Sequence, residues 1–166
     1  MTAATAATAV SRYAQLVRET LGETWLPRIY RERILRLRTR SYHFEAAIPK
    51  ARIEIQHTLL GVELKIGRRR LLCPDLATAR YLSVFARVGV TDVAVPYDIT
   101  KISHIADELE SSWYRMLLLV EQDAAKETPK FRGRVRGLII AQIRAEIIAA
   151  GSGTRIPEFR GIPKRR

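Results

Sequence analysis

The chain has 166 residues, 47% of them apolar, so it is long and apolar enough for one domain with a buried core rather than a disordered chain. Its 29 basic and 17 acidic side chains give a formal net charge of +12. An excess of this size favours a polyanionic partner such as RNA, DNA, anionic lipid or an acidic protein surface. The single cysteine excludes an internal disulfide and a multi-cysteine metal site.

Neither a membrane span nor a signal peptide is visible in the sequence. No apolar run approaches the ~18–20 residues that cross a bilayer. The start, MTAATAATAV, has neither the basic residues nor the apolar block of a secretory signal. We therefore expect a cytoplasmic protein without a membrane partner.

Helical patterns fill the first part of the chain. After an Ala/Thr-rich start over residues 1–8, which we expect to be frayed, Ser11 can cap a helix that Gly22 ends. Its apolar positions are spaced by three or four residues: Tyr13, Leu16, Val17 and Leu21. A second helical segment begins at Thr24 or Trp25, with Pro27 in its first turn.

Strand patterns follow an arginine-rich segment whose last turn could be extended, and a break over residues 41–50 that contains Pro49. From Arg52 to Cys73 apolar and polar residues alternate between turns at Gly61 and Gly67. This pattern predicts a three-stranded antiparallel meander with one apolar face.

The second half of the chain returns to helices. Asp75 is expected to cap a helix that Gly89 ends, and residues 90–97 read as a fourth, mostly buried strand. From Asp98 or Thr100 a long helix is predicted, with an apolar stripe of Ile102, Ile105, Leu109, Trp113, Met116, Leu117 and Val120. A polar linker over residues 122–130 leads to a last predicted helix from Arg134 to Ala150.

These elements predict a single α+β domain over residues 1–150, followed by a basic, flexible tail at 151–166. Its expected sheet is small and mostly antiparallel, with the meander plus one strand after a helix, and is packed by N- and C-terminal helices.

Basic side chains form three groups along the sequence. Phosphate binding needs several cations on one surface, and guanidinium groups match phosphate oxygens. We expect nucleic-acid contacts from Arg36, Arg38, Arg40, Arg68, Arg69, Arg70, Lys130, Arg132, Arg134 and Arg136. This requires the three groups to converge in space; the alternative is a solvated basic face with local pairs such as Glu32–Arg36.

Aromatic residues near these arginines would strengthen the RNA hypothesis only if they were exposed, because bases stack on exposed rings. Tyr30, Tyr42, Phe44 and Phe131 are instead predicted to pack mainly in the core.

A metal-dependent nuclease is a further hypothesis. Glu63 and Lys65 lie two residues apart on a predicted strand, with Glu54 or Glu45 upstream, and such a set could hold Mg²⁺ and a water. Alternating charge is also typical of the exposed face of any half-buried strand. The Pro74-Asp75 pair follows this strand and serves as a helix cap.

The remaining reactive residues predict no catalytic or cofactor site. Cys73 lies among apolar residues, where a buried structural thiol is the ordinary case. His43, His57 and His104 lack ligand spacing, and His57 is predicted to be a core histidine. We expect no cofactor, since no glycine-rich loop follows a strand and opens a helix. The acidic cluster Asp107, Glu108 and Glu110 is predicted to be a solvated face, with a basic partner or a second copy as the alternative.

The leading hypothesis is a non-enzymatic, basic nucleic-acid-binding protein, with RNA or a ribonucleoprotein favoured over sequence-specific DNA. No helix pair with a polar recognition helix is visible, because the helix starting after Asp75 is followed by a strand. The alternative is an assembly or regulatory factor whose arginines dock on an acidic protein surface, and a nuclease comes third.

Overall fold

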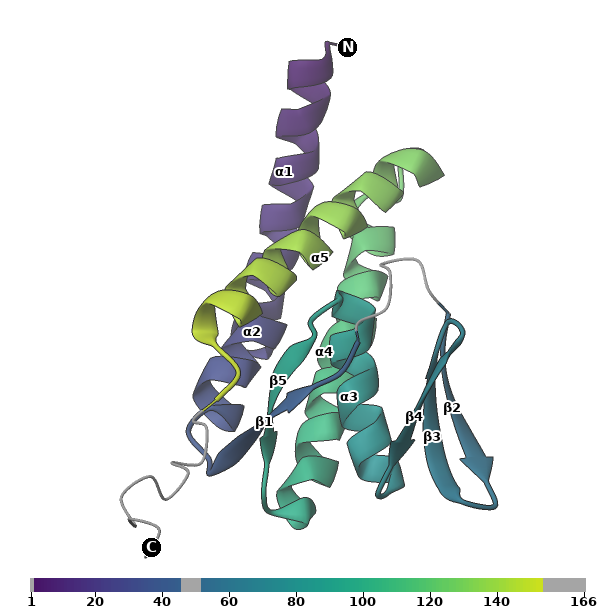
Figure 1. Ribbon diagram of the computed structural model, residues 1–166. Coiled ribbons are helices and arrows are strands. Elements are labelled where there is room, and N and C mark those ends of the chain that lie inside the picture. The colour runs from purple at the N-terminus through teal and green to yellow at the C-terminus, as the bar shows by residue number, and fades with distance from the viewer. Residues whose placement is uncertain (1, 46–51, 154–166) are drawn as a thin grey trace, which may run out of the picture.

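The structure is a computed structural model that describes residues 2–45 and 52–153. The predictions for Pro49 and for most of the tail, from residue 154 on, lie outside these residues. Within them, helices pack against two small antiparallel sheets, one of two strands and one of three, and the three-stranded sheet lies at the right-hand edge in Figure 1. The α+β class and the packing by N- and C-terminal helices are confirmed.

Helix α1 (Ala3–Leu21) begins eight residues before the predicted cap at Ser11. The hydroxyl of Thr2 accepts a hydrogen bond from the Thr5 N–H at 3.3 Å, and the alanines that follow favour a helix, so the start is ordered rather than frayed. The buried positions are Val10, Ala14, Val17 and Leu21. Leu16, which was expected on this face, is 46% exposed.

The second helical segment is confirmed and has three parts. A short 3₁₀ turn, η1 (Gly22–Thr24), leads into α2 (Leu26–Ile29), and a π-helical turn, η2 (Tyr30–Ile34), follows. Pro27 lies in the first turn of α2, where its missing N–H costs no hydrogen bond. The segment ends where the Leu35 N–H donates to the Tyr30 carbonyl at 2.9 Å.

The two-stranded sheet pairs β1 (Thr39–His43) with β5 (Asp92–Pro96), in the register Ser41 opposite Ala94. The fourth predicted strand is therefore present and buried, but it does not join the meander in one four-stranded sheet. The partner of β5 is instead β1, which begins in the arginine-rich segment whose last turn could be extended and runs into the predicted break at residues 41–50. Alternation is weak in β1 because Arg40, Ser41 and His43 are all exposed.

The predicted meander is confirmed as β2 (Ile53–Thr58), β3 (Gly61–Ile66) and β4 (Arg69–Cys73). Gly67, with φ of +60°, makes the second turn, and its N–H donates to the Arg52 carbonyl at 2.8 Å. Leu64 and Ile66 are buried, and the meander packs on α3 (Figure 1).

Helices α3 (Leu76–Val88), α4 (Ile99–Asp123) and α5 (Pro129–Ala150) complete the fold. The Asp75 carboxylate accepts from the Thr78 N–H at 2.7 Å, which confirms the predicted cap. α3 lies between the meander and α4, so it is buried on most sides. α5 begins at Pro129 rather than Arg134, because the Thr128 hydroxyl accepts from the Phe131 N–H at 3.1 Å and caps an earlier turn.

Two tyrosine hydroxyls form hydrogen bonds with the backbone edge of β5 that faces away from β1. The Ala94 N–H donates to the Tyr30 hydroxyl at 3.1 Å, and the Tyr81 hydroxyl donates to the Ala94 carbonyl. Tyr30 in turn donates to the Gly151 carbonyl at 2.5 Å, just after α5. Burial raises the pKa of both tyrosines, so they remain neutral donors. One network thus connects η2, α3, β5 and the end of α5.

The Tyr30→Phe variant should lower the free energy of unfolding by about 1–3 kcal/mol, because it leaves the buried Ala94 N–H and the Gly151 carbonyl without this partner. Urea unfolding followed by circular dichroism measures the change. Tyr114→Phe is the matched control, since Tyr114 is 56% exposed. Equal unfolding free energies for the two variants would contradict the role of the Tyr30 hydroxyl.

Candidate functional site

Of the four basic side chains at the start of α5, two form ion pairs with α4 and two are exposed. Arg132 Nε and Arg136 Nη1 pair with the two carboxylate oxygens of Glu121 on α4, at 3.0 and 2.8 Å. Arg132 also donates to the Glu127 carbonyl at 2.6 Å. These two arginines hold the α4–α5 corner together. Lys130 and Arg134 are exposed and form no ion pair with any carboxylate of the described residues.

The triple arginine lies at the β3–β4 turn, as predicted, and all three side chains are exposed. Arg69 forms an ion pair with Glu45, just after β1. Arg70 lies opposite Lys65 on the outer face of the meander, where the two cations repel each other. Within the described part of the chain, Arg68 and Arg70 have no ion-pair partner.

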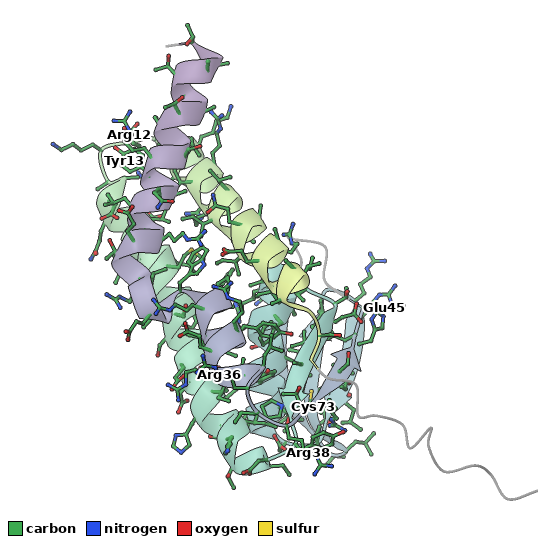
Figure 2. The ribbon with its side chains drawn as sticks, turned by 90° about the vertical axis from the view of Figure 1, so that its left-hand side faces the viewer. Arg12, Tyr13, Arg36, Arg38, Glu45 and Cys73 are labelled. Carbon is green, nitrogen blue, oxygen red and sulfur yellow. The ribbon has the colours of Figure 1, made fainter. Side chains whose placement is uncertain are left out.

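The third group, Arg36, Arg38 and Arg40, is exposed and likewise has no ion-pair partner in the described ranges. The predicted Glu32–Arg36 pair is wrong, because the Glu32 carboxylate is taken by Arg28 at 3.1 Å. Arg36 lies in the turn after η2, whereas Arg38 and Arg40 lie on one side of an extended segment. Figure 2 shows Arg36 well above Arg38, at a different part of the surface.

The three groups do not merge into one patch. In Figure 1 the β3–β4 turn lies at the upper end of the meander, α5 starts at the top of the molecule, and β1 starts near the bottom. The ten residues taken together therefore do not form one basic patch, so phosphate contacts are to be expected from separate groups. Five cations outside the helices, Arg36, Arg38, Arg40, Arg68 and Arg70, are exposed and lack an ion-pair partner among the described residues.

The carboxylates of the acidic cluster on α4 form ion pairs with arginines of neighbouring elements instead of facing only solvent. Arg80 of α3 pairs with Asp107 and, at 2.9 Å, with Glu110, and the two carboxylates raise the pKa of its guanidinium. Arg33 of η2 pairs with Glu108 at 2.7 Å. The predicted solvated face is therefore a set of ion pairs between helices, worth most where the pairs are partly buried.

A cleft of about 560 Å³ lies between the η1–η2 segment and α4. Its charged lining includes Glu32, Arg33, Asp107 and Glu108, which the ion pairs above already engage. Ser112 at its base donates to the Thr24 carbonyl at 2.6 Å. The polar groups of the cleft thus mainly join α4 to the N-terminal helices.

Glu54, Glu63 and Lys65 of the nuclease hypothesis lie on one face of the meander, but the described residues form no cluster of metal ligands. In the β2–β3 register Glu54 lies opposite Lys65, and Gln56 lies opposite Glu63, so all four share the outer face. Arg52 Nε binds the Glu54 carboxylate at 2.6 Å, and Glu45 is paired with Arg69. Within residues 2–45 and 52–153, no three His, Cys, Asp or Glu side chains cluster as metal ligands.

The histidines and the cysteine form no catalytic set. His43 Nδ1 lies 2.8 Å from the Asp92 carboxylate on exposed surface. His57 is exposed, so its assignment as a core histidine is wrong: it shares a side with Ile55, but it lies at the end of β2 beside the turn. Cys73 is 3% exposed, and burial raises the pKa of its thiol to about 11.

Two surface features were not predicted from the sequence. Tyr97, just after β5, is 37% exposed, and Arg38 lies over its ring. Leu59 and Leu60 form the β2–β3 turn and are 106% and 83% exposed, respectively. Their β-turn was visible in the sequence through Gly61, but nothing in the alternation showed that both leucines would lack a packing partner.

Comparison of the chain with protein-family models, with curated proteins and with solved structures finds no match. Among the described residues, no helix has the length and apolar character needed to cross a membrane. Functional arguments therefore rest on the side chains of this protein alone.

Cys73 should react with a chromogenic disulfide reagent about 100-fold more slowly in the folded protein than in urea at about pH 8. A pKa of about 11 leaves about 100-fold less thiolate than the ordinary value of 9.0, and burial restricts access as well. Stopped-flow absorbance measures both rates. A folded-state rate equal to that in urea would show a reactive, accessible thiol.

Proposed function

We propose that the protein is a non-enzymatic binder of nucleic acid, with RNA favoured, and that arginines outside the helices provide the phosphate contacts. The observation that carries this proposal is the exposure of Arg36, Arg38, Arg40, Arg68 and Arg70 without an ion-pair partner among the described residues. A phosphate oxygen can replace water at such a guanidinium without first breaking an internal ion pair.

Ion pairing separates these arginines from several of those on the helices. Arg18 and Arg31 bind Glu146, at 2.9 and 3.7 Å, and Arg80 binds two carboxylates of α4. Their charges help to join helices and are partly neutralised by their partners. Arg40 of β1, and Arg68 and Arg70 at the β3–β4 turn, contribute to the net charge of +12 without this compensation from the described residues.

A sequence-specific DNA reader is a poorer fit. Many readers of the major groove insert an exposed helix, although a two-stranded β-ribbon also fits there. α3 has buried residues on nearly every side, among them Tyr81, Leu82, Val84 and Phe85, because the meander and α4 cover it. The exposed basic groups lie instead on a strand and on turns, which suits backbone contacts to RNA. The expected cytoplasmic location remains a prediction.

Replacing Arg68 and Arg70 by Gln should weaken binding to a short labelled RNA and lower the magnitude of the log–log salt slope by about 1.4, since each lost phosphate contact removes about 0.7 for single strands. Fluorescence anisotropy from about 50 to about 200 mM salt measures this slope.

Arg132→Gln/Arg136→Gln is the matched control, because it removes the same charge from side chains that Glu121 already binds. We expect a clearly smaller change in slope for this variant. Equal slopes would mean that only total charge matters, and a wild-type protein that fails to bind RNA at about 50 mM salt would end the proposal.

The second candidate function is docking to another protein, and the exposed leucines of the meander favour it. Leu72 and Leu76 are 55% and 43% exposed, and Leu72 Cδ1 lies 3.6 Å from where a Cβ on Gly61 would stand. Together with Leu59 and Leu60 they bring apolar surface to one end of the meander. Contiguous exposed apolar surface is typical of interaction sites.

The Leu59→Ser/Leu60→Ser variant should leave the free energy of unfolding within about 0.5 kcal/mol of the wild type, because neither side chain is buried. Leu64→Ala, at a position with 0% exposure, should cost about 2–5 kcal/mol in the same urea titration. If the leucines dock a partner, a nuclease-treated pull-down with the wild type should recover one stoichiometric protein. The Leu59→Ser/Leu60→Ser variant should lose this protein, and Arg68→Gln/Arg70→Gln should retain it. A double variant as destabilised as Leu64→Ala would show that the leucines belong to the core.

A further inference from the structure

A tyrosine and an arginine meet at the lower end of the two-stranded sheet. The Arg38 guanidinium carbon lies 5.3 Å from the centroid of the Tyr97 ring, a cation–π distance. The Tyr97 N–H also donates to the Arg38 carbonyl at 3.1 Å, which extends the β1–β5 ladder by one pair. The backbone therefore fixes the two side chains on the same face of the sheet.

Both side chains remain open to solvent. Arg38 is exposed and Tyr97 is 37% exposed, and Ile99 beside them is 62% exposed. A tyrosine used only for packing would lie against the core, as Tyr30 and Tyr81 do with 0% exposure. The Arg38–Tyr97 pair instead presents a guanidinium and an aromatic ring in cation–π contact at the surface (Figure 2 labels Arg38 at this end).

Two further cations flank the pair. Arg40 lies two residues along β1 on the same side as Arg38, about 6.6 Å away along the strand. Lys101 lies exposed in the first turn of α4. The carboxylate of Asp98 also lies here, but it accepts from the Thr100 N–H at 3.0 Å and from the Thr100 hydroxyl at 2.7 Å. Its charge is therefore engaged as the cap of α4.

We propose that Arg38 and Tyr97 form a stacking site for one unpaired base of a single-stranded nucleic acid, with Arg40 and Lys101 contacting the neighbouring phosphates. This inference rests on the proposed function and identifies its ligand as single-stranded. Bases in a duplex already stack on each other, so only an unpaired base can offer its face to tyrosine or guanidinium. Stacking on a ring tolerates any base sequence, because every base has a flat face.

Anisotropy titrations with single-stranded RNA, single-stranded DNA and double-stranded RNA of equal phosphate number test the site. The wild type should prefer both single strands. Tyr97→Leu should weaken single-strand binding by at least about 5-fold while leaving the duplex unchanged. Tyr97→Phe, which keeps the ring, should bind like the wild type. Arg38→Lys should keep the salt slope but lose part of the single-strand preference, because the ammonium is not planar.

Tyr114→Leu is the control, since Tyr114 is a still more exposed tyrosine on α4, about 22 Å along the helix from Ile99. It should change neither affinity. If Tyr97→Leu leaves the ratio of single-strand to duplex affinity at the wild-type value, the stacking site is refuted while the proposed function stands. A wild-type protein that binds none of the three ligands refutes both. A preference for RNA over single-stranded DNA supports the site with an added 2′-hydroxyl contact, and equal binding supports it without one.

Discussion

The fold depends on the hydrogen bonds that two buried tyrosines make to Ala94. β5 has β1 on one side only, so the N–H and carbonyl that Ala94 presents on the other side would be buried without partners. The hydroxyls of Tyr30 and Tyr81 provide them, and Tyr30 also donates to the Gly151 carbonyl. Because these residues come from η2, α3 and the end of α5, the position of the small sheet is fixed by helices rather than by further strands.

That arrangement has a consequence for the surface. A two-stranded sheet covered by helices leaves only its ends and one strand open, and the arginines of β1 and its approach lie there. The helices use their own arginines to join one another, as Arg33 does with Glu108 and Arg136 with Glu121. Partly buried pairs of this kind are satisfied internally. Exposed cations without an ion-pair partner among the described residues lie both outside the helices, as Arg38 and Arg40 do, and on them, as Lys130 and Arg134 do.

Some predictions from the sequence held because local physics decides them. The meander was predicted from the alternation of apolar and polar residues on strands that turn at Gly61 and Gly67. The cap of α3 was predicted from the position of Asp75. The stripe of α4 also held, since Ile102, Leu109, Met116 and Val120 are buried. Within the candidate site, the exposure of Arg68, Arg69 and Arg70 was predictable from their place at a hairpin turn. Each of these depends on neighbours within a few residues.

The α+β class, the meander, the cap of α3 and the excess of positive charge could be predicted from the sequence alone, because they depend on short-range periodicity, turn residues and composition. Only the tertiary structure decided that β5 pairs with β1, that Glu121 engages Arg132 and Arg136, and that Arg38 lies over Tyr97. The β5 and Arg38 partners lie about 50 residues or more apart in sequence, and closing such loops depends on how all helices pack together. No local sequence pattern predicts how the helices pack together.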